Sequence, residues 1–190
     1  KGANDRLRIA VAGLNGRGGS HIGGFGGIKG VEIAYVADPD ANVRGRRLKD
    51  VQGKGHKNCK AVADIREALE DPEVDAISVA APNHWHSLMT IWGAQAGKHV
   101  YVEKPMSHDV EEGRVAVAAQ KKYGVVIQHG TQRRSDGNIA GLHEMIKEGT
   151  WGKLKIACGY CCKPRGGIGN KGASSPPENL DWDLWKGPAV

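Results

Sequence analysis

Residues 7–19, LRIAVAGLNGRGG, join an apolar run to a loop rich in glycine. A buried strand that passes through such a loop into a helix is the context in which a dinucleotide-binding fingerprint is credible. Gly13 permits the tight turn, while Gly16 and Gly18 let the backbone approach a pyrophosphate and the sheet. The alternative is a tight packing turn without a ligand. The strand before the loop and an acidic residue after the next strand favour the binding site.

Asn15 stands where the usual G-x-G-x-x-G motif has its second glycine. Asn tolerates positive φ better than most residues and Gly16 follows directly, so the departure weakens the motif without removing it. From Arg17 onward, the free N–H groups at the helix start would face the phosphates of a bound dinucleotide.

Beyond this loop, short runs rich in β-branched residues alternate with segments that carry helix signals. The alternation predicts a parallel sheet with helices on both faces. The expected strands are residues 7–12, 31–37, 75–80, 99–103 and 125–129, with a weaker one at 60–62. Their order indicates an α/β fold, a doubly wound parallel sheet of the Rossmann dinucleotide-binding type, with the cofactor across the carboxyl ends of the strands.

Acidic caps and glycines mark the expected helix boundaries. Asp64 and Asp109 are each followed by Glu three residues later, which is typical of a capping box at a helix start. Gly97 and Gly124 suit left-handed caps at helix ends. A further helix is expected at residues 139–147.

We expect two domains, of which residues 1–150 form the NAD(P)-binding one. Residues 151–160, WGKLKIACGY, predict a strand that opens a second α/β domain. Residues 166–177 are rich in Gly, Ser and Pro, and too little chain follows them to build another core. Residues 151–190 are therefore interpreted as the beginning of a truncated substrate domain.

The composition excludes several classes of protein. No apolar run approaches the roughly 18 residues that a membrane-spanning helix needs. The formal net charge is +6, but the basic residues are spread along the chain and a single Phe offers little for base stacking, so no nucleic-acid partner is expected. The four cysteines lack the paired spacing of a zinc framework, so no metal site is expected and their redox state stays open.

Asp38 follows the second expected strand, 25 residues after Gly13. A carboxylate near this position accepts hydrogen bonds from the adenosine ribose in dinucleotide-binding folds. It favours NAD, because a 2′-phosphate would bring like charges together. Arg44 and Arg46 on the next helix could soften that repulsion, which leaves NADP possible. Capping of that helix is a second role for Asp38, and the two roles are compatible.

Two polar segments follow later strands: residues 81–86, APNHWH, and residues 102–105, VEKP. Together with the glycine loop and residues 96–100, AGKHV, they occur in an order that is specific as a set. On these motifs the chain resembles the glucose-fructose oxidoreductase, inositol dehydrogenase and MocA family of NAD(P)-dependent oxidoreductases over about residues 5–165. The resemblance implies a Rossmann domain followed by an α/β domain with a large open sheet.

The resemblance implies reversible oxidation of a sugar or polyol hydroxyl by hydride transfer to the nicotinamide. Lys104 would be the catalytic residue, reaching the reacting oxygen, where its charge stabilises a developing alkoxide. The Lys104–Pro105 bond is expected to be cis, since only an X-Pro bond accepts that geometry at small cost. Further residues that the resemblance places at the cofactor are Pro82, Asn83, His86, Glu103 and Pro105.

Residues 130–135, GTQRRS, follow the last expected strand and would lie at the cofactor edge, with Gln132 and Arg133 among the cofactor contacts. His84 and His129 are weaker candidates, because a histidine at a strand end is more often a hydrogen-bonded structural residue than a catalyst.

The family's second domain normally supplies the histidine that accepts the proton, and nothing after Thr150 matches its motif. The chain is therefore interpreted as a fragment, or else as a nucleotide-binding module that does not complete the reaction. Alone it should turn over no sugar and should expose Trp151, Ile156, Trp182 and Trp185. A homo-oligomer through the absent domain is also expected.

The compartment stays open between cytoplasm and periplasm. Some relatives look like exported bacterial proteins with twin-arginine leaders, and a start at Lys1 would fit the removal of such a leader.

Three functions remain open at this point. The first is the cofactor domain of a sugar or polyol dehydrogenase, and the second is an NAD-using glycosidase or eliminase that oxidises its substrate transiently. The third is a non-catalytic nucleotide-binding module. Net accumulation of reduced nicotinamide would separate the first from the second.

Overall fold

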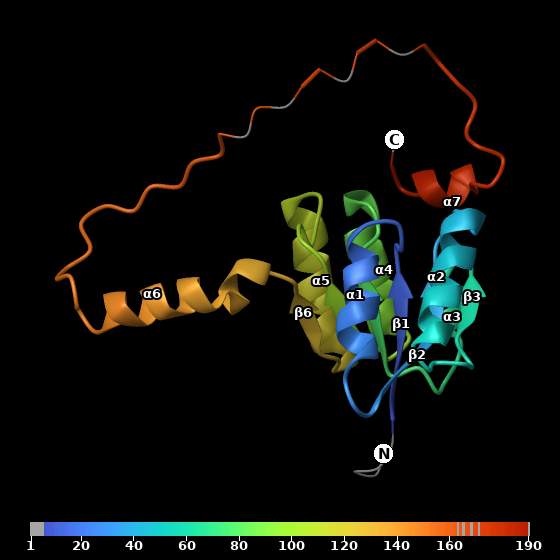
Figure 1. Ribbon diagram of the computed structural model, residues 1–190, viewed down its shortest axis with the longest axis horizontal. Coiled ribbons are helices and arrows are strands. Elements are labelled where there is room, and N and C mark those ends of the chain that lie inside the picture. The colour runs from blue at the N-terminus through green and yellow to red at the C-terminus, as the bar shows by residue number, and fades with distance from the viewer. Residues whose placement is uncertain (1–5, 163, 165, 168, 171, 190) are drawn as a thin grey trace. The chain divides into compact units, whose positions relative to one another are not determined.

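The computed structural model describes residues 6–162, 164, 166–167, 169–170 and 172–189, and within them six parallel strands form one sheet (Figure 1). The strand order is β3-β2-β1-β4-β5-β6. The strands are β1 (Leu7–Ala12), β2 (Val31–Ala37), β3 (Lys60–Val62), β4 (Ala76–Val79), β5 (His99–Val102) and β6 (Ile127–His129). This is the predicted Rossmann fold. The first three strands have the predicted bounds, and the last three are one or two residues shorter than predicted.

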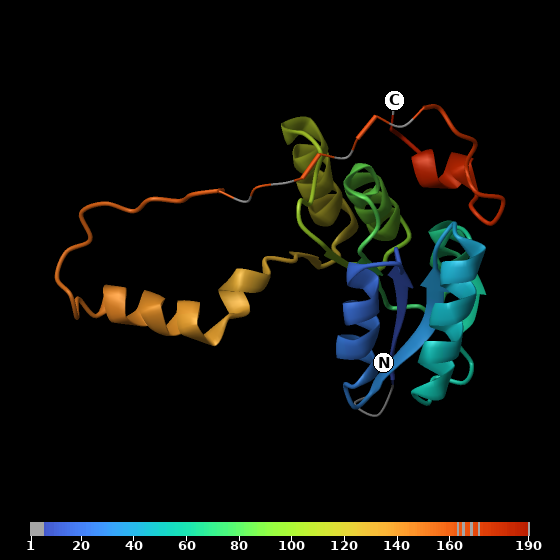
Figure 2. The same ribbon diagram turned by 45° about the horizontal axis from the view of Figure 1, so that its top comes forward.

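The helices fill the crossovers between strands. They are α1 (Arg17–Gly26), α2 (Ala41–Gly53), α3 (Ile65–Leu69), α4 (Asn83–Gln95) and α5 (Val110–Tyr123). The 3₁₀ helix η1 (Gln132–Ser135), α6 (Gly137–Lys147) and the short α7 (Trp182–Lys186) follow. Figure 2 shows α1 and α2 on one face of the sheet and α4 and α5 on the other.

The central strand β1 is buried on both faces, which explains its continuous apolar sequence. Successive side chains of a strand point to opposite faces. Ile9 and Val11 therefore belong to the core beside α1 and α2, together with Ile22. Ala10 and Ala12 belong to the opposite core, which includes residues of α3 and neighbouring strands.

Acidic side chains begin several helices, and the starts predicted at Asp64 and Asp109 are confirmed. Asp109 Oδ1 accepts the Glu112 N–H at 2.8 Å. The predicted helix end at Gly124 is also confirmed, with φ of 65° in the left-handed region. The cap of α2 is Asp40, whose Oδ1 accepts two backbone N–H groups, so the capping role considered for Asp38 belongs to its neighbour.

The chain divides into two units, one made of Lys1–Gly130 with Pro176–Val190 and the other of Thr131–Ser175. The last segment of the first unit joins the loop after β2. Asn179 O accepts the Ala41 N–H at 2.9 Å, and Pro39 O accepts the Asp181 N–H at 3.2 Å. The domain boundary expected after residue 150 stays a prediction.

The prediction of a strand at residues 151–160 is wrong, because these residues form no strand. A strand needs hydrogen bonds from a neighbouring strand, and none of the strand pairs of the described residues includes this segment. Trp151 is 62% exposed and Ile156 is 78% exposed, as expected from the sequence. Trp182 and Trp185 are also partly exposed.

We predict that Asp40→Ala lowers the free energy of unfolding by about 1 kcal/mol, because α2 loses its N-cap. Asp40→Asn should cost less, since Asn caps nearly as well. Urea unfolding followed by tryptophan fluorescence measures both changes. Asp50→Ala on the same helix is the control, because the Asp50 carboxylate is exposed and an ion pair at the surface contributes little. Equal losses in Asp40→Ala and Asp50→Ala would contradict the capping role.

Candidate cofactor-binding site

The glycine loop lies at the carboxyl end of β1, beside β4, where the strand order reverses. Gly13 has φ of 80°, and a Cβ on it would overlap the backbone of Ala81. A Cβ on Gly18 would overlap the carbonyl of Gly13. These two positions therefore require glycine. A Cβ on Gly16 would meet no atom of the described residues within 4 Å, so the space beside this residue is open.

The start of α1 faces this open space. Gly16 is the N-cap of α1, and no side chain of the described residues caps the helix. The first N–H groups of a helix carry a partial positive charge and bind anions when no side chain occupies them. The loop therefore has the geometry of a phosphate site.

A cavity of about 400 Å³ adjoins the loop and the ends of β2, β3 and β4. Its volume is in the range of small-molecule and cofactor sites. The predicted cofactor residues that line it are Gly13, Asn15, Gly16, Arg17, Asp38 and Pro82. These residues come from three separate loops, and the fold brings them to one cavity.

Asp38 ties the end of β2 to the glycine loop. Its Oδ2 accepts the Leu14 N–H at 2.7 Å, and its Oδ1 accepts the Asp40 N–H at 2.9 Å. Burial raises the pKa of Asp38 above its usual value, against the lowering effect of these two hydrogen bonds. A carboxylate has about four acceptor positions, so further bonds to a ribose are compatible with this arrangement.

Three arginines of α2 surround this part of the site. Arg44 donates to the carbonyl of Asp38, and Arg46 lies 3.5 Å from Asn15 Oδ1. Arg47 Nε donates to Leu14 O at 3.1 Å, a contact that the sequence analysis missed. The cluster of basic residues on the helix after β2 was the sequence signal from which the Arg47 contact could have been found. These cations lie near Asn15 and Asp38, beside the glycine loop.

A second buried carboxylate, Glu103, follows β5. Its Oε1 accepts Arg17 Nε at 2.9 Å and lies 3.0 Å from His21 Nε2. His21 Nδ1 is in turn 2.8 Å from the hydroxyl of Ser78. Because an ionised carboxylate only accepts hydrogen bonds, Nε2 of His21 donates to Glu103. The predicted residues Glu103 and Arg17 thus form one network with two residues that were not predicted.

His21 could have been found from the helix period. It lies four residues after Arg17, on the same face of α1. Burial raises the pKa of Glu103, but hydrogen bonds from Arg17 and His21 outweigh this effect and hold the pKa below its usual value. Glu103 is therefore an ionised carboxylate in the interior of the site.

Lys104 follows Glu103 and is exposed, and the Lys104–Pro105 bond is cis, as predicted. His86 is 1% exposed and lies between two carbonyl groups. Its Nδ1 is 2.5 Å from Pro105 O, and its Nε2 is 2.8 Å from Ala81 O. His86 thus joins the loop after β4 to the turn that carries Lys104. Neither Lys104 nor His86 lines the cavity.

The other predicted residues are more dispersed. Asn83 is the first residue of α4, and His84 Nε2 lies 3.0 Å from Trp185 O. His129 Nε2 is buried without a hydrogen-bond partner in the described residues. Gln132 and Arg133 lie in η1 of the second unit, where Arg133 pairs with Asp136. Their assignment to the cofactor stays a prediction.

Neither a metal-binding cluster nor a membrane-spanning helix occurs among the described residues. No group of three or more His, Cys, Asp or Glu side chains there could hold a metal ion. No helix in the described ranges is long and apolar enough to cross a membrane.

Fold and loop geometry define a dinucleotide-binding domain of the Rossmann class. A family profile described as "Oxidoreductase family, NAD-binding Rossmann fold" matches residues 7–131, and the chain belongs to this family, GFO/IDH/MocA. The chain is homologous to NAD(P)-dependent dehydrogenases that act on sugars and inositols.

Three similar proteins give the extent of the match. Myo-inositol 2-dehydrogenase of Thermotoga maritima is 35% identical over 79% of this chain and 43% of its own. scyllo-Inositol 2-dehydrogenase (NAD(+)) of Bacillus subtilis is 34% identical over 78% of this chain and 42% of its own. The crystal structure of myo-inositol 2-dehydrogenase from Lactobacillus plantarum superimposes with a TM-score of 0.71 at 26% identity, covering 79% of this chain and 43% of that one. The chain spans less than half the length of these relatives.

We predict that Glu103→Gln lowers the free energy of unfolding at pH 7 by about 2 kcal/mol, because charged hydrogen bonds to Arg17 and His21 are lost. Since the folded-state pKa of Glu103 is lowered, its contribution is complete above the ordinary pKa of 4.5 and is lost as the pH falls through the folded-state value. The difference between the two proteins should therefore shrink at acidic pH.

Urea unfolding at several pH values measures this difference. Glu111→Gln is the matched control, because the ion pair of Glu111 with Arg114 is exposed on both sides and should contribute almost nothing. A pH-independent gap between wild type and Glu103→Gln would show that the folded-state pKa of Glu103 is not lowered.

Proposed function

We propose that this chain is the cofactor domain of a dehydrogenase that oxidises a sugar or polyol hydroxyl with NAD. The observation that carries the proposal is the cavity at the glycine loop, which brings the open start of α1 and the carboxylate of Asp38 together. The relatives named as inositol 2-dehydrogenases support a cyclic polyol as the substrate class.

The residues of this chain have separable tasks in this proposal. The N–H groups from Gly16 onward bind the pyrophosphate. Asp38 accepts hydrogen bonds from the adenosine ribose, which favours NAD over NADP. The bound nicotinamide supplies the acceptor for hydride.

Lys104 acts on the substrate side of the same site. Its ammonium group lies after β5 and stabilises the negative charge that develops on the oxygen as hydride leaves. Glu103, through its hydrogen bond from the Lys104 N–H at 3.3 Å, and His86, through Pro105, hold the turn that presents this lysine. A proton acceptor would come from outside residues 1–190, within a second domain that also holds the substrate.

The cofactor preference is tested with Asp38→Asn. We expect the wild-type chain to bind NAD more tightly than NADP in a fluorescence titration. Asp38→Asn should weaken NAD about tenfold and leave NADP unchanged or tighter, because a charged hydrogen bond to the ribose contributes about 1.5–3 kcal/mol. Equal affinity of the wild type for both cofactors would contradict the role of Asp38, while failure to bind either would contradict the proposed function.

If Lys104 is catalytic, replacing it should lower the rate of polyol oxidation without lowering the affinity for NAD. In the longest product of the gene, Lys104→Met should lower kcat for polyol oxidation at least about 100-fold, a size typical of the loss of one group that stabilises an oxyanion. NAD affinity should change little. Reduced nicotinamide is followed by its absorbance, with the exposed Lys153→Met as control. The 190-residue chain alone should show no turnover, and full activity of Lys104→Met would rule out the assignment.

A further inference from the structure

A segment from the C-terminal part of the chain forms one side of the cofactor cavity. Leu180, Leu184 and Trp185 line it together with residues of the glycine loop. Leu184 and Leu180 are half-buried. These residues belong to the same unit as the sheet, although more than 130 residues separate them from the loop after β2 that they contact (Figure 1).

One end of this segment is fixed to the loop that carries Asp38. Asn179 Nδ2 donates to Asp40 Oδ1 at 2.8 Å, and Asp40 and Leu180 form an isolated antiparallel bridge. The carbonyl of Pro39 accepts the Asp181 N–H. These bonds hold residues 179–181 against the rim of the cavity that follows β2.

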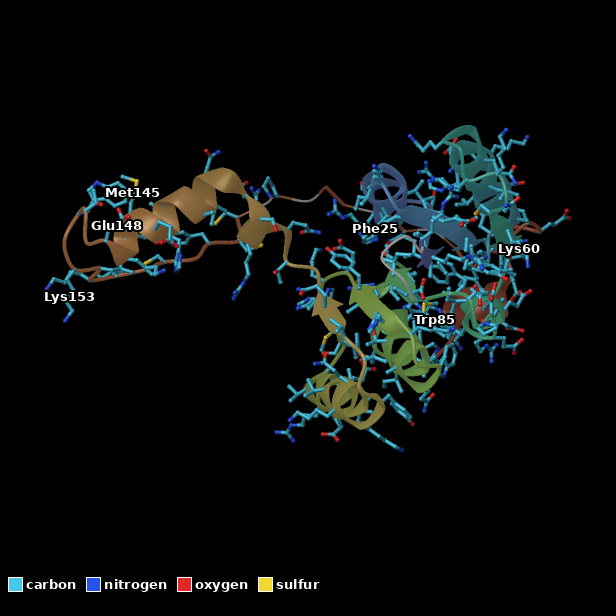
Figure 3. The ribbon with its side chains drawn as sticks, turned by 90° about the horizontal axis from the view of Figure 1, so that it is seen from below. Phe25, Lys60, Trp85, Met145, Glu148 and Lys153 are labelled. Atoms are coloured by element: carbon cyan, nitrogen blue, oxygen red, sulfur yellow. The ribbon has the colours of Figure 1, made fainter. Side chains whose placement is uncertain are left out.

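The other end is fixed to the first turn of α4, which follows β4. The indole Nε1 of Trp85 donates to Leu184 O at 3.0 Å, and His84 Nε2 lies 3.0 Å from Trp185 O. A Cβ on Gly187 would overlap the indole ring of Trp85, so the backbone of Gly187 lies directly on that ring. Figure 3 shows the labelled Trp85 next to α7.

Residues 179–187 therefore span the cavity from the rim after β2 to the rim after β4. The cavity extends to Asp64 and Ile65 after β3, on the side away from β5, and Lys104 does not line it. In the proposed function this is the side of Asp38, the ribose-binding residue. The cavity thus corresponds to the adenosine half of the dinucleotide.

The chemistry of the wall fits an adenosine. Leu180, Leu184 and Trp185 offer apolar surface for a purine, while Asp38 offers acceptors for ribose hydroxyls. Cofactor pockets commonly combine an apolar lining with a few fixed polar groups. Stacking of a base on an aromatic side chain is itself favourable.

We propose that residues 179–187 are the outer wall of the adenosine subsite, and that this wall strengthens cofactor binding by shielding the adenine from water. The proposal rests on the proposed function, because it takes the cavity to be the NAD site. It assigns Leu184, Trp185 and Gly187 to cofactor binding, although none of them belongs to the glycine fingerprint.

The test compares variants of the wall with ligands that represent each half of NAD. Gly187→Ala pushes the segment off Trp85, and Leu184→Ala removes apolar surface without changing the backbone. Gly159→Ala is the matched control, because a Cβ there meets no atom of the described residues within 4 Å. Dissociation constants are measured by calorimetry for NAD, AMP and nicotinamide mononucleotide, with melting temperatures to check folding.

We expect both wall variants to weaken NAD and AMP by the same factor, about five- to tenfold. The affinity for nicotinamide mononucleotide should stay within twofold, as should all affinities of Gly159→Ala. Unchanged AMP affinity in both wall variants overturns the proposal while the proposed function survives. Tighter AMP binding also overturns it, since the segment would then obstruct the site. A wild-type chain that binds neither NAD nor AMP overturns the proposed function together with this one.

Discussion

The site depends on a close backbone approach at the carboxyl end of β1. The carbonyl of Gly13 occupies the space that a side chain on Gly18 would need, and Gly13 itself lies against the backbone of Ala81. This contact sets the direction of α1 and brings the loop after β4 to the glycine loop. A side chain at either glycine would force the helix away from the sheet, and the N–H groups at the helix start would no longer face the cavity.

Two buried carboxylates then connect the ends of β2 and β5 to this loop and to α1. Asp38 links the end of β2 to Leu14, and Glu103 links the end of β5 to Arg17 and His21. Burial acts on both carboxylates, yet their net pKa shifts have opposite signs, because Glu103 also has cationic and imidazole partners while Asp38 has two backbone N–H groups among its partners. Glu103 therefore keeps its negative charge to a lower pH than Asp38 does.

The sequence was sufficient for features that depend on local or periodic patterns. The strands, the glycine turn and the caps at Asp64 and Asp109 follow from alternation and from turn chemistry, and the structure confirms them. Contacts between distant segments could not be predicted in this way. The partners of Glu103 come from α1, and the contact of Trp85 with Leu184 joins residues 99 positions apart. The strand expected at residues 151–160 failed for the same reason, since alternation alone does not supply a neighbouring strand.

The attachment of residues 179–187 to the sheet also bears on how the fold tolerates change. The cost of closing a flexible loop grows only with the logarithm of its length, by about 0.6 kcal/mol for each doubling. Residues 131–175 separate the sheet from this segment in the chain. Residues 131–175 could therefore become longer or shorter during evolution at little cost to the attachment of residues 179–187. Asn179 and Gly187, which make the contacts, could not be replaced as freely. Translation has a related consequence, because the sheet emerges from the ribosome before the segment that encloses its cavity.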